Sequence, residues 1–93
     1  MIMTTTTTTE RQFIEQYPMR SNARHFAARL LNSTRSGEQT EAHIAVVAEQ
    51  CGVSVEMREE IIGASLDAGL VRGTMLTTEQ SGEFGAVAAL TRA

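Results

Sequence analysis

His25, His43 and Cys51 are the residues of this sequence whose types best suit metal binding or nucleophilic catalysis. They lie far apart, have none of the paired spacings of zinc motifs, and are too few to complete a structural zinc site. Cys51 falls on the apolar side of a predicted helix, where a free cysteine is usually a small core residue. We therefore expect a buried cysteine, two histidines on helix surfaces and no metal site.

Other catalytic signatures are missing from the sequence. Serine, threonine and glutamate are plentiful, but none lies in a nucleophile elbow, a phosphate-binding loop or a dinucleotide-binding glycine pattern. We expect no catalytic residues, no cofactor and no enzymatic activity.

The composition is that of one soluble domain. The 93 residues are 42% hydrophobic and 20% charged, a balance that favours a globular fold over a disordered chain. No apolar run is long enough to span a bilayer, and the first residues do not resemble a signal peptide. Together with the single cysteine, these features predict a cytoplasmic protein without a membrane partner.

Charge is distributed unevenly around a net value of -3. Residues 1–35 carry five arginines and two glutamates, a balance of +3. Residues 36–93 carry three arginines and nine acidic residues, a balance of -6. Lysine is absent. Because the guanidinium group forms bidentate contacts with phosphate, the arginines are the candidates for any nucleic-acid contact.

Apolar spacing and capping residues predict four helices after a threonine-rich tail. We expect residues 1–9 to be disordered and residues 10–93 to form the domain. Thr9, Ser21 or Asn22, Thr40 and Ser54 are suitable N-caps, and Gly52 and Gly69 suit helix ends. The expected helices cover about 10–16, 23–33, 41–50 and 55–68, with a polar loop over 32–39.

The pattern changes after Gly69. Residues 70–78 are rich in apolar and β-branched types, 79–85 contain two glycines, and 86–92 are suited to a returning strand. A short helix over 86–93 is the alternative, since alanine favours helices. The expected fold is mainly α with a small C-terminal β-hairpin, in the α+β class.

A helix, a glycine turn, a second helix and a hairpin occur in this order in winged helix-turn-helix domains. Residues 44–54 resemble the helix-turn of that family: Ala48 lets the helices approach, Gly52 forms the turn, Val53 fills the core and Ser54 caps the second helix. Residues 66–71 resemble its step into the wing, so the resemblance covers about residues 40–73. It implies a winged-helix fold, in which the second helix corresponds to the recognition helix that enters the major groove in DNA-binding members.

Two features depart from that family. The second helix buries Met57 and Ile61, where the usual spacing would place the first apolar residue at Arg58. Its exposed positions are also acidic, and acidic side chains repel DNA phosphates. These positions are Glu56, Arg58, Glu59, Glu60 and Gly63. The predicted wing tip, residues 79–85, is acidic as well, and its Phe84 is suited either to anchor a partner or to pack on the hairpin.

Two functions fit these features. The first is a protein-interaction module that binds an unidentified protein or a second copy through Glu56, Arg58, Glu59, Glu60 and Phe84. Its size and lack of catalytic motifs are similar to those of small effectors that phages and mobile elements encode against host factors. The alternative is a DNA-binding transcriptional regulator that uses the helix-turn-helix at about 42–68. In that case the phosphate-binding residues would be Arg20, Arg24, Arg29, Arg35, Arg58 and Arg72.

Overall fold

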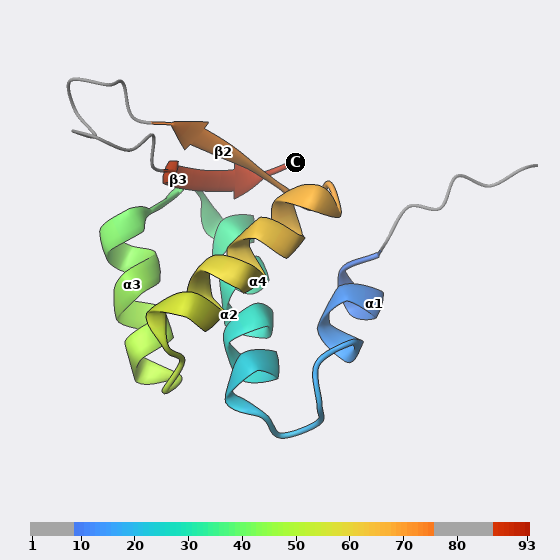
Figure 1. Ribbon diagram of the computed structural model, residues 1–93. Coiled ribbons are helices and arrows are strands. Elements are labelled where there is room, and N and C mark those ends of the chain that lie inside the picture. The colour runs from blue at the N-terminus through green and yellow to red at the C-terminus, as the bar shows by residue number, and fades with distance from the viewer. Residues whose placement is uncertain (1–8, 76–86) are drawn as a thin grey trace, which may run out of the picture.

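The structure, a computed structural model that describes residues 9–75 and 87–93, is mainly helical with one small sheet (Figure 1). The predicted α+β class is confirmed, and the chain forms a strand rather than a helix over 87–92. The tail residues 1–8 and the predicted wing tip, including Phe84, lie outside the described residues. The elements are α1 (Glu10–Glu15), α2 (Asn22–Ser36), β1 (Gln39–Thr40), α3 (Glu41–Gln50), α4 (Val55–Asp67), β2 (Val71–Met75) and β3 (Val87–Arg92).

The four helices found in residues 9–75 and 87–93 all begin at a hydroxyl-bearing N-cap. In each helix the cap oxygen accepts a hydrogen bond from the backbone N–H three residues later, which would otherwise lack a partner. In α1 the Gln12 side chain also accepts from the backbone of Thr9, completing a capping box. The sequence predicted the caps Thr9, Thr40 and Ser54, and of the two candidates for α2 the cap is Ser21, with Asn22 as the first helical residue.

Helices α3 and α4 end in the same way, at glycines in the left-handed region. Gly52 has φ of +73°, and its N–H donates to Glu49 while Val53 N–H donates to Ala48. Gly69, with φ of +75°, makes the corresponding bond to Leu66. These helix ends are Schellman motifs, in which backbone N–H groups beyond the helix donate to carbonyls of the last turn that would otherwise lack a partner. The turn between α3 and α4 is therefore short, as predicted, and Val53 packs against the core.

The predicted loop over residues 32–39 is wrong in its first half, because α2 continues to Ser36. Thr34 is buried, and its hydroxyl donates to the carbonyl of Leu31 at 2.8 Å. Because the hydroxyl has a hydrogen-bond partner within its own helix, the Thr34 side chain can lie in the core. Gly37 follows as the cap residue, and the chain then enters β1.

The sheet has a third strand that the sequence did not predict. β3 lies in the centre and pairs antiparallel with β1 and β2, so Leu90 is opposite both Gln39 and Gly73. The helices lie on one face of the sheet (Figure 1). Apolar side chains from the helices and the sheet meet there in one core, whose largest fully buried members include Phe13, Phe26, Leu30, Leu31, Ile61 and Leu90.

Candidate interaction surface on α4

One side of α4 is fixed in the core. Ile61 and Ser65, one helical turn apart, are fully buried. The Ser65 hydroxyl donates to the carbonyl of Ile62 at 2.7 Å, which satisfies its polar atom inside the core. Met57 and Ala64 pack against the same core from partly buried positions. The residues on the other side of α4 consequently face solvent.

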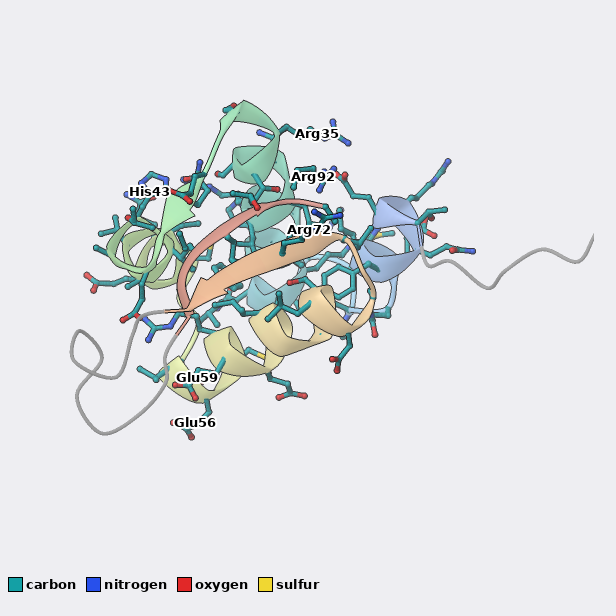
Figure 2. All side chains as sticks on the ribbon, turned by 90° about the horizontal axis from the view of Figure 1, so that it is seen from above. Arg35, His43, Glu56, Glu59, Arg72 and Arg92 are labelled. Atoms are coloured by element: carbon teal, nitrogen blue, oxygen red, sulfur yellow. The ribbon has the colours of Figure 1, made fainter. Side chains whose placement is uncertain are left out.

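The solvent side of α4 carries three exposed carboxylates, as the helical spacing predicted: Glu56, Glu59 and Glu60. Figure 2 shows Glu56 and Glu59 pointing outward, on the opposite side of the molecule from Arg35 and Arg92. Val55 is 56% exposed beside them. We call these four residues the α4 surface. Arg58 and Gly63, predicted to be exposed with them, are partly buried.

The carboxylates of the α4 surface form no ion pair within residues 9–75 and 87–93. The three ion pairs found in this part of the chain all use a carboxylate of α1, joining Arg11 to Glu15 and both Arg35 and Arg92 to Glu10. Glu60 does act on a neighbour: burial and then the negative charge of Glu60 raise the pKa of Tyr17. Glu60 is therefore close enough to Tyr17, which follows α1, for its charge to act there.

The arginines predicted to contact phosphate do not form one surface. Arg20 and Arg24 line a hollow beside α2, and Arg35 at the far end of that helix is engaged with Glu10. Arg72 is exposed on β2, on the face of the sheet away from the helices (Figure 2). Arg58 belongs to α4, and Arg29 is partly buried on α2. These positions do not give the continuous basic face that a DNA backbone requires.

The histidines and the cysteine are also distributed over separate sites. Cys51 is buried at the end of α3, whereas His25 on α2 and His43 on α3 are exposed, as predicted. Among the described residues, no three side chains of His, Cys, Asp or Glu are close enough to share a metal ion. Nor does any helix in that part of the chain have the length and apolarity required to cross a bilayer.

Sequence reasoning missed Val55 as a member of the α4 surface. Val55 precedes Ile61 by six residues, and at 3.6 residues per turn the two side chains fall on different faces of the helix. The helical period therefore carried the signal that could have placed Val55 beside the exposed glutamates. In the structure it is an apolar side chain bordered by carboxylates.

Comparisons with known proteins find no matching family model, no matching curated protein and no matching solved structure. The functional argument therefore depends on the residues and their arrangement.

Proposed function

We propose that this chain is a non-enzymatic, winged-helix-like binding protein that acts through protein–protein contact at the α4 surface. The observation that carries the proposal is the exposed Val55 bordered by carboxylates that form no ion pair in the described part of the chain. An apolar side chain with charged neighbours is suited to a protein partner that offers an apolar contact and basic groups.

The order of the elements supports the winged-helix part of the proposal. Helix α3, the turn at Gly52, helix α4, the turn at Gly69 and the β2–β3 pair follow one another as in that family. Ala48 is buried in the core and Val53 packs against it, which is compatible with the roles that the resemblance implies.

A DNA-binding regulator is the second candidate, and the same element order favours it. In that reading α4 would enter the major groove, with Arg58 as its basic side chain. Its three exposed glutamates would then face phosphates, whose neutralisation supplies much of the affinity of DNA-binding proteins. Because nothing on the α4 surface offsets this repulsion, we place protein contact first.

Two assays on one purified sample separate these candidates. The first measures binding to random-sequence duplex DNA at low salt, where phosphate contacts are strongest. The second measures affinity capture of proteins by the wild-type chain and by a variant with Glu56→Ala, Glu59→Ala and Glu60→Ala. A control variant with Glu38→Ala, Glu49→Ala and Asp67→Ala makes the same charge change at exposed positions outside the α4 surface.

For protein contact we expect no DNA binding, and capture that is lost in the α4 variant but kept in the control. Capture that is equal in all three proteins would exclude the α4 surface. DNA binding that weakens with salt, and weakens further with Arg58→Ala, would make the regulator the better reading.

A further inference from the structure

A groove lies between α1 and α2, and the proposed function gives it no role. It consists of two adjoining hollows of about 550 and 320 Å³ that share Ile14 and Arg24. Phe13 on α1 belongs to the core, and Tyr17, which follows α1, packs against it. Ile14 is partly buried against the same core and also lines both hollows. Ile14 therefore gives the groove an apolar wall.

The groove is positively charged near the N-terminal end of α2. Arg20, Arg24 and His25 line the smaller hollow, together with Ile14. Within residues 9–75 and 87–93, neither Arg20 nor Arg24 forms an ion pair. In the larger hollow, by contrast, Arg11 and Arg35 are already engaged by carboxylates of α1. The smaller hollow is thus suited to a ligand with an apolar side chain and one or two carboxylates.

The chain itself has such a segment at the start of α4. Val55 supplies an exposed apolar side chain, and Glu56 and Glu59 supply carboxylates within one turn of it. No residue of α4 lines either hollow. The start of α4 lies beside the α3 end, away from α1 (Figure 1), so the groove of one molecule is not filled by its own α4.

We propose that the α1–α2 groove binds the first turn of α4 from a second copy of this chain, with Val55 against Ile14 and with Glu56 and Glu59 facing Arg20 and Arg24. This inference rests on the proposed function, because it names a second copy as a partner of the α4 surface. The two contacting surfaces differ, so one copy of a bound pair keeps a free α4 surface and the other keeps a free groove. Such a contact is heterologous: each added copy presents a new free surface, so the assemblies grow longer as the concentration rises.

Sedimentation velocity on the full chain tests this contact. The concentration is raised to about 1 mM, because exposed charge pairs give weak affinities. The salt is kept near 0.05 M, where screening is weak, and then raised to about 0.5 M. We expect the weight-average mass to rise to at least twice that of one chain at low salt and to return to one chain at high salt.

Two neutralising variants test the direction of the contact. One carries Arg20→Gln and Arg24→Gln in the groove, and the other carries Glu56→Gln and Glu59→Gln on the α4 surface. Each alone should remain a single chain, whereas an equal mixture should form dimers that do not grow, since each partner retains only one working surface. A control with Arg29→Gln and Arg72→Gln has the same charge change as the groove variant and should assemble like wild type.

Three results would overturn the inference: a wild-type chain that stays monomeric at low salt, a groove variant that assembles like wild type, or a mixture that stays monomeric. If the α4 alanine variant nevertheless loses a captured protein in such a case, the proposed function stands with a different partner. If it loses none, the α4 surface is excluded and both proposals fail.

Discussion

Glu10 in the first turn of α1 forms an ion pair with Arg92 at the end of β3, 82 positions away in the sequence. The same carboxylate oxygen accepts from Arg35 of α2 at 2.8 Å. Partial burial of Glu10 opposes its ionisation, but hydrogen bonds from Arg35 and Arg92, with their charges, outweigh this and lower the pKa of the carboxyl. Through these two ion pairs, the ionised Glu10 side chain links α1 to the last helical turn of α2 and to the C-terminal strand.

We expect Glu10→Gln to lower the free energy of unfolding at neutral pH by about 1 to 2 kcal/mol, because hydrogen bonds to charged groups are lost in a partly buried site. A lowered pKa means that the folded state favours the ionised form, so this stabilisation is present above the ordinary value of 4.5. It is lost as the pH falls through the folded pKa. Urea unfolding of both proteins at pH 7 and below pH 4 measures the difference, which should shrink in acid; a constant difference would contradict this account.

Phe13 makes α1 a structural part of the domain rather than an attachment to it. The side chain is only 1% exposed and belongs to the core cluster. Phe13→Ala should cost about 3 to 5 kcal/mol, a large share of the roughly 5 to 14 kcal/mol expected for a chain of this length. Thermal and urea denaturation measure this loss. Arg11→Ala, on the exposed side of the same helix, serves as the control and should change stability by less than about 0.5 kcal/mol.

Local chemistry predicted most of the helical framework. The caps at Thr40 and Ser54 and the glycine at 52 are short-range signals, and α3 occupies the predicted residues. The same helical period placed Glu56 and Glu59 on the solvent side of α4.

The sequence could not predict features that depend on residues distant along the chain. β1 is only two residues long, too short for a strand period, and it exists because Thr40 pairs with Ala89. The extension of α2 depends on a buried site for Thr34, and the groove depends on how α1 packs against α2. Such relations follow from tertiary packing, which overrides local preference.

Two glycines should respond to alanine in opposite directions. Gly52 has φ of +73°, and an added Cβ would approach the Asn22 amide nitrogen to 3.0 Å, so Gly52→Ala should destabilise by about 1 to 2 kcal/mol. Gly63 lies inside α4, and apart from its chain neighbours and the nearby backbone of α4 no atom lies within 4 Å of an added Cβ, so Gly63→Ala should stabilise by about 0.5 to 1 kcal/mol. Paired denaturant melts check both. Equal changes in the free energy of unfolding for the two variants would contradict this difference between the two backbone sites.

If the carboxylates of the α4 surface repel DNA, replacing them with lysines should give a chain that binds DNA. We expect Glu56→Lys with Glu59→Lys to produce binding to duplex DNA at low salt that the wild-type chain lacks, because a helix of this orientation would then present cations to phosphates. Each lysine that contacts a phosphate should steepen the slope of log affinity against log salt by about 0.9. Fluorescence anisotropy with a labelled duplex measures both quantities.

The matched control for this reversal is Glu38→Lys with Glu41→Lys, which makes the same net charge change at exposed positions before and at the start of α3. An equal gain in the control would show that net charge alone determines DNA binding. A gain confined to the α4 variant would mean that the acidic side chains of the α4 surface, and not the net charge of the chain alone, oppose DNA binding.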